Sequence, residues 1–147
     1  MGTFIRIGFD AIEAQVPAEP GLYEIYTQEG VPLKVGIGGN LRRRLLQHRQ
    51  SRQKYLLLRP GGSWSNPADV TSKRSILAKH LYFANPVTGF DLTTEQGRQQ
   101  FLLKKCYLQF QVTSTREEAR ELEKVLETEG RFQFVGRTEK ASQTGGA

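Results

Sequence analysis

The sequence contains very little cysteine and histidine. Its 147 residues include one cysteine, Cys106, and two histidines, His48 and His80. One cysteine excludes an internal disulfide, and one thiol with two imidazoles is too small a ligand set for a structural zinc site. We therefore expect a chain held together without disulfides and without zinc.

Long apolar runs are also missing. The longest contain four residues, at 55–58 and 81–84, whereas a membrane-spanning helix needs about 20. The N-terminal residues include Asp10 and Glu13 and lack the apolar core of a signal peptide. We therefore expect a cytoplasmic protein without a membrane segment.

Acidic residues are absent between Glu29 and Asp69, although the whole chain carries 15 of them and a net charge of +6. The same window contains eight cations: Lys34, Arg42, Arg43, Arg44, Arg49, Arg52, Lys54 and Arg59. Such a window predicts a positive face that attracts phosphates and releases their counterions. A solvated basic surface without a partner is the alternative. A membrane surface is a weaker interpretation, because glycine and proline interrupt the window.

The composition is that of one globular domain, with 37% hydrophobic and 24% charged residues. The sequence predicts strands over residues 21–27, 32–37 and 106–112, the first two joined in a hairpin. Helices are predicted over 41–49, 71–83, 94–104 and 115–130. Asn40 is a good N-cap for the first helix, and Thr115 to Glu118 matches a capping box that opens the last. Residues 1–20 are expected as an irregular or short-strand lead-in, 132–134 as extended, and 137–147 as a flexible tail.

Five polar residues stand where core packing alone does not explain them. Tyr23 and Lys34 lie on the two strands of the hairpin. Arg44 and His48 are four residues apart, so they share one face of the first helix. Glu123 borders the apolar stripe of the last helix, where a carboxylate is costly unless it binds a cation or hydrogen-bond donors. Taken singly, each residue also has an ordinary structural interpretation.

Together these positions resemble the GIY-YIG nuclease family. The resemblance covers about residues 21–130, and its most specific feature is the placement of Arg44 and His48, eight and twelve residues after Gly36. The motif residues are Gly21-Leu22-Tyr23, Lys34-Val35-Gly36, Asn40-Leu41, Arg44, His48 and Leu122-Glu123 before Leu126. The resemblance implies an α+β fold, a small three-stranded antiparallel sheet flanked by helices. The domain would span residues 21–136, with a helical insertion at about 49–105 between the first helix and the third strand.

The resemblance also implies an activity, the metal-dependent hydrolysis of DNA phosphodiester bonds. It assigns Tyr23 to the attacking water, Arg44 to the scissile phosphate, and His48 to a place near the phosphate or the nucleophile. Glu123 would hold a single Mg²⁺ or Mn²⁺ ion. Lys34 stands where typical members have tyrosine. Some branches of the family also have lysine at this position, where it would assist the base or hold a phosphate.

Two other functions remain open from the sequence. Lys34 in place of tyrosine favours an inactive nucleic-acid-binding module of the same fold, whereas the set of Arg44, His48 and Glu123 favours an enzyme. A protein-interaction domain with an acidic partner is a third possibility. For either nucleic-acid function, the predicted DNA contacts outside the catalytic set are Arg42, Arg43, Arg49, Arg52, Lys54 and Arg59.

Overall fold

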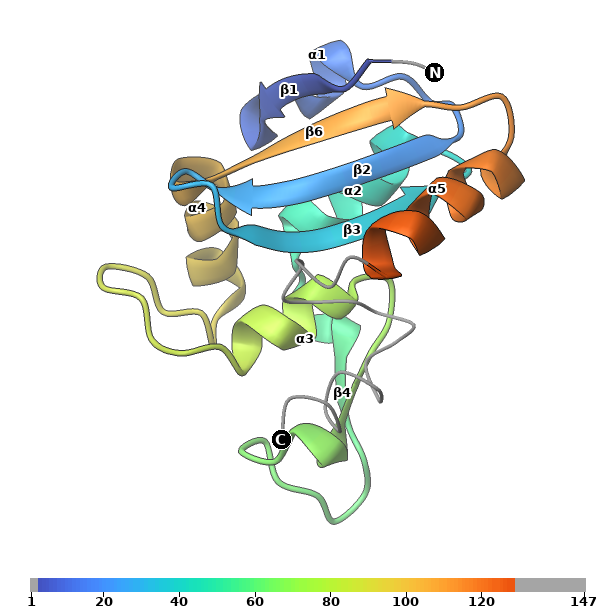
Figure 1. Ribbon diagram of the computed structural model, residues 1–147. Coiled ribbons are helices and arrows are strands. Elements are labelled where there is room, and N and C mark those ends of the chain that lie inside the picture. The colour runs from blue at the N-terminus through green and yellow to red at the C-terminus, as the bar shows by residue number, and fades with distance from the viewer. Residues whose placement is uncertain (1–2, 129–147) are drawn as a thin grey trace.

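The computed structural model describes residues 3–128 (Figure 1). The predicted end of the last helix at residue 130, the extended segment at 132–134 and the tail at 137–147 lie outside the described residues. None of the described helices is both long enough and apolar enough to cross a membrane. The strands are β1 (Ile5–Gly8), β2 (Gly21–Thr27), β3 (Pro32–Gly38), β4 (Leu56–Leu58), β5 (Val70–Ser72) and β6 (Cys106–Val112). The α-helices are α1 (Ile12–Gln15), α2 (Leu41–Gln50), α3 (Ile76–Tyr82), α4 (Glu95–Lys105) and α5 (Arg116–Thr128).

The main sheet is antiparallel and has the strand order β1-β6-β2-β3. The three strands that the sequence predicted are confirmed as the neighbours β6, β2 and β3. The predicted count of three strands is wrong. The lead-in, expected as irregular or as a short strand outside the domain, forms β1 and pairs with β6, placing Ile5 opposite Phe110. The turn after β1 is also part of the fold, since Phe9 and Ile12 are fully buried.

Successive residues of β2 point to opposite faces of the sheet, as strand geometry requires. Tyr23 and Ile25 face the larger core, which α2, α3 and α4 complete. Leu22 and Tyr26 face the smaller core, which is closed by α5 through Ala119. The sheet is therefore covered by α5 on one face and by the other helices on the opposite face (Figure 1).

The sequence predicted a helical insertion between α2 and β6, but this segment also contains strands. Besides α3 and α4 it contains a second sheet, in which β4 pairs with β5. Helix α3 consequently begins at Ile76 rather than at residue 71, because residues 70–72 are paired as a strand. The fully buried Arg98 of α4 joins this segment to the end of α2, since its guanidinium donates to the Ser51 carbonyl at 2.8 Å.

The two helices that carry candidate residues begin at the predicted caps. The Asn40 side chain accepts a hydrogen bond from the Arg43 amide at 3.0 Å and opens α2. The Thr115 hydroxyl accepts one from the Glu118 amide at 3.1 Å and opens α5. The Glu118 carboxylate accepts from the amide of Ser114 rather than of Thr115, so the capping box is displaced by one residue. Because the caps fix the first residue of each helix, they also fix which side chains lie on each face of the helix.

Candidate active site

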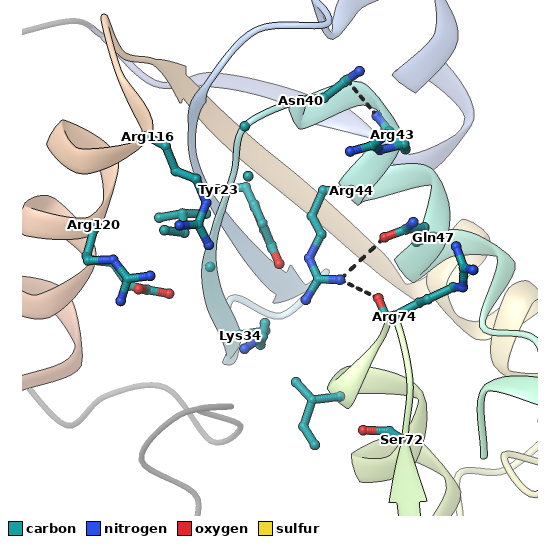
Figure 2. A pocket seen from close by; sticks show the side chains of 16 residues that line it. Tyr23, Lys34, Asn40, Arg43, Arg44, Gln47, Ser72, Arg74, Arg116 and Arg120 are labelled. Carbon is teal, nitrogen blue, oxygen red and sulfur yellow. Dashed lines mark hydrogen bonds between the residues drawn. The ribbon is translucent and has the colours of Figure 1, made fainter. Parts of the chain in front are cut away.

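A cavity of about 740 Å³ lies beside β3, one of the two edge strands of the main sheet. Figure 2 shows Arg116 and Arg120 reaching into it from α5, with Arg44 and Arg74 on the other side. The Tyr23 side chain and Lys34 lie between these two walls. The charged lining residues are Lys34, Arg43, Arg44, Arg74, Arg116, Arg120 and Glu123. With six cations and one carboxylate among the described residues, the cavity is built to receive an anion.

Tyr23 reaches the cavity by crossing the neighbouring strand. It pairs with Gly36 of β3, and a Cβ added to Gly36 would overlap the Tyr23 hydroxyl. The missing side chain lets the ring lie flat over β3, and the side chain thereby lines the cavity beyond the edge of the sheet. The sequence motif around Gly36 thus has a steric reason in this structure.

The Tyr23 hydroxyl is hydrogen-bonded to Nε2 of His48 at 2.5 Å, and both side chains are fully buried. Nδ1 of the same histidine lies 2.7 Å from the Ser75 hydroxyl. Burial lowers the pKa of His48 well below its usual value, and the charges of Arg44 and Lys34 lower it further. Burial also raises the pKa of Tyr23 to about 12, although the nearby Arg44 opposes the shift. At neutral pH both side chains are therefore uncharged.

His48 does not line the cavity itself. It shares a helix with Arg44, but only Arg44 lines the cavity, whereas His48 lies behind Tyr23 in the core. Any effect of His48 on a ligand in the cavity therefore passes through the Tyr23 hydroxyl. Helical spacing indicated which face His48 occupies, but it carries no information on depth.

Arg44 is held by the segment that follows β5. Its guanidinium donates to the backbone carbonyl of Arg74 and, at 3.4 Å, to the Gln47 side chain (Figure 2). Arg74 has a φ of 67°, a left-handed conformation that is uncommon outside glycine. The next residue is Ser75, which contacts His48. Two consecutive residues of the inserted segment thus contact Arg44 and the partner of Tyr23.

Lys34 and Glu123 complete the set that the resemblance assigned to catalysis. Both line the cavity and are only about 4% exposed. Lys34 comes from β3 and Glu123 from α5, so the lining residues Tyr23, Lys34, Arg44 and Glu123 come from four elements. Glu123 is the single acidic side chain among the described lining residues.

This donor set suits only one kind of metal site. No group of three or more histidine, cysteine, aspartate or glutamate side chains in residues 3–128 could hold a metal ion. Mg²⁺, however, commonly keeps several waters and binds through one or two carboxylates together with substrate phosphates. The Glu123 carboxylate therefore fits a Mg²⁺ ion that a bound phosphate helps to hold, and does not fit a structural metal centre.

Most of the predicted DNA contacts lie elsewhere. Of the six basic residues named for that role, Arg43 lines this cavity. Arg42 donates to the Val16 carbonyl at 2.8 Å. Arg49 forms an ion pair with Glu13 and lowers the pKa of that carboxyl to about 2. Arg59 pairs with Asp69 at 2.5 Å, while Arg52 and Lys54 are exposed outside the cavity.

Two cavity residues on α5 were missed by the sequence analysis. Arg116, Arg120 and Glu123 are spaced i, i+4 and i+7, which places them on one face of a helix. This spacing is visible in the sequence, but it does not show that this face of the helix borders a cavity. The sequence did not distinguish Arg74 from the other basic residues of the inserted segment, because its place beside the cavity depends on the loop after β5.

Comparisons of the chain with models of protein families, with curated proteins and with solved structures found no match. The family resemblance therefore depends on the residue types and spacings of the motifs. The nuclease activity that the resemblance implies stays a prediction.

Proposed function

We propose that the protein is a divalent-metal-dependent endonuclease that hydrolyses DNA phosphodiester bonds with a GIY-YIG-type fold and active site. One observation carries the proposal. Tyr23, Lys34, Arg44 and Glu123, which come from four separate elements, line one cavity in which cations outnumber carboxylates. This arrangement supports phosphate binding, water activation and metal binding in one place.

The scissile phosphate binds between Arg44 and Lys34. A guanidinium presents paired donors to two phosphate oxygens, and its contact with the Arg74 carbonyl holds it in place before substrate binds. Lys34 adds a second positive charge in a buried position. Both charges stabilise the negative charge that develops on the phosphoryl oxygens in the transition state.

Tyr23 orients the attacking water and takes its proton. As that proton moves to the Tyr23 oxygen, the phenolic proton passes to Nε2 of His48, and Ser75 accepts from Nδ1 throughout. Neither residue is charged in the resting protein, so the pair serves as a relay rather than as a standing phenolate. A bound phosphate reduces the repulsion that Arg44 and Lys34 exert on a charged His48, which makes the relay easier.

Glu123 is the residue that would hold the metal ion. When bound, Mg²⁺ or Mn²⁺ acts as a Lewis acid on the phosphate and neutralises charge at the leaving oxygen. Because the surrounding cations repel a metal ion, Glu123 needs the phosphate as a second anionic partner. We therefore expect weak metal binding by the free protein.

The first experiment is a cleavage assay on supercoiled plasmid and branched DNA with Mg²⁺, Mn²⁺ or EDTA. We expect cleavage with either metal and none with EDTA. Glu123→Gln should abolish cleavage and leave DNA binding unchanged or tighter, because it removes a negative charge from the cavity. Glu121→Gln is the matched control, since Glu121 is exposed on the same helix and pairs with Lys124 at 3.6 Å. Unchanged cleavage by Glu123→Gln would refute the assignment, and DNA binding without any cleavage by the wild type would favour the inactive binding module.

A further inference from the structure

Helix α5 is acidic in composition but basic toward the cavity. Its thirteen residues, Arg116–Thr128, include five glutamates, two arginines and one lysine. Both arginines line the cavity, and of the five glutamates Glu123 alone does so. Glu118 instead accepts from the Ser114 amide, and Glu121 pairs with Lys124. Helix α5 thus presents two arginines and one glutamate to the cavity, while Lys124 and the other four glutamates lie outside it.

The cavity is also larger than the scissile phosphate requires. A volume of about 740 Å³ falls in the range of sites that enclose a whole drug-sized ligand, roughly 300–1,000 Å³. Arg44 and Arg74 lie on one side of it and Arg116 and Arg120 on the other (Figure 2). One phosphate held at Arg44 leaves the arginines of α5 facing a different part of the ligand.

We infer that Arg116 and Arg120 form a second phosphate site, which binds a backbone phosphate next to the one at Arg44. The inference deepens the proposed function and rests on it, since it makes the substrate an internal stretch of a DNA strand rather than a terminal phosphate. Arginine suits this role because its planar donors grip phosphate oxygens in pairs. Arg116 also lies in the first turn of α5, where the helix dipole adds to the attraction for an anion.

The site is tested by DNA binding without cleavage. Fluorescence anisotropy of a short labelled duplex, in EDTA over a salt series, measures the slope of log K against log salt concentration. Each lost phosphate contact makes this slope less steep by about 1. We expect the double variant Arg116→Gln/Arg120→Gln to make the slope less steep by about 1, because the two arginines hold one phosphate. Lys124→Gln is the matched control on the same helix and should leave the slope unchanged, because Lys124 does not line the cavity.

A second arm connects the arginines to a particular phosphate. Single backbone phosphates of the duplex are replaced in turn by neutral methylphosphonates, and the affinity is measured at each position. The wild type should lose affinity at two or more neighbouring positions. The double variant should become insensitive at one of them, while Arg44→Gln becomes insensitive at another. If the double variant does not fold, Arg116→Gln alone replaces it, since Arg116 is exposed, with an expected change in the same direction of at most about 1.

The outcomes separate this inference from the proposed function. Equal salt slopes and equal methylphosphonate profiles for wild type and variants would overturn the second phosphate site, even if the protein cleaves DNA. The expected profiles without any cleavage by the wild type would keep the phosphate site and overturn the nuclease. Failure of the wild type to bind DNA at low salt would overturn both.

Discussion

Gly36 lacks a side chain at the position where the Tyr23 ring needs the space. A Cβ there would overlap the ring, and the ring is fully buried with its hydroxyl bound to His48, so it has little room to move. We expect Gly36→Ala to lower the free energy of unfolding by about 1–3 kcal/mol, the usual cost of overpacking. Gly39→Ala is the control, because its nearest neighbour would be 3.9 Å away. Equal urea midpoints for the two variants would contradict this reading of the motif.

Arg44 and Arg43 both line the cavity, yet only Arg44 is held by a backbone carbonyl and lies beside Tyr23. Arg44→Ala should therefore slow single-turnover cleavage by at least ~100-fold, the scale of losing one aimed charge-stabilising donor. Arg43→Ala should mainly weaken binding, with a smaller effect at saturating DNA. Arg44→Lys should recover little of the cleavage rate, because the point charge of lysine does not replace the contact of a guanidinium with two phosphate oxygens. Equal losses from both alanine variants, recovered at low salt, would reduce Arg44 to part of a basic patch.

The inserted segment acts on the site through two consecutive residues, Arg74 and Ser75. Arg74 adopts φ of 67°, and its carbonyl accepts from Arg44. A left-handed conformation costs a non-glycine residue about 1–2 kcal/mol. Arg74→Gly should therefore be more stable than Arg74→Ala by about 1 kcal/mol, and it should keep more cleavage activity because it keeps the carbonyl in place. Both variants lack the side-chain charge, so their difference isolates the backbone. Urea unfolding and single-turnover rates measure it.

The elements that the sequence predicted well are those with local signals. Alternation revealed β2 and β6, and Asn40 marked the start of α2 within one residue. The pairing of β1 has no such signal, because Ile5 meets Phe110, which lies 105 residues later in the chain. The three-residue strands β4 and β5 are too short for alternation to show, so β5 was included in the predicted helix.

The candidate site divides in the same way. Tyr23, Arg44 and Glu123 were found from residue type and spacing, and all three line the cavity. Ser75 was not found, because its contact with His48 joins residues 27 positions apart through the fold. The spacing of Arg116 and Arg120 from Glu123 is local and visible in the sequence, but their place at the cavity depends on how α5 packs on the sheet.

At the scale of the whole molecule, a basic stretch of sequence does not become one basic face. Of the eight cations between Glu29 and Asp69, three line the cavity: Lys34, Arg43 and Arg44. Others are used within the chain, as in the pairs of Arg49 with Glu13 and of Arg59 with Asp69. The cavity gains further positive charge from the two arginines of α5, so its potential is a property of the fold rather than of one segment.

The stability of the whole molecule should depend on pH through its two histidines. Burial, the largest cause in both cases, lowers the pKa of His48 well below 6.5 and that of His80 to about 4. Below pH 6.5 the unfolded chain therefore binds protons that the folded chain does not. The stability that these two neutral histidines permit is complete above pH 6.5 and is lost as the pH falls. The free energy of unfolding should drop by up to ~1.4 kcal/mol per pH unit for each histidine. Urea unfolding at pH 7.5, 6.5 and 5.5 measures this slope, and His80→Gln should reduce it by about half. A stability that stays constant or rises between pH 6.5 and 5.5 would show that His48 is protonated in the folded protein, and the neutral Tyr23–His48 relay would then be wrong.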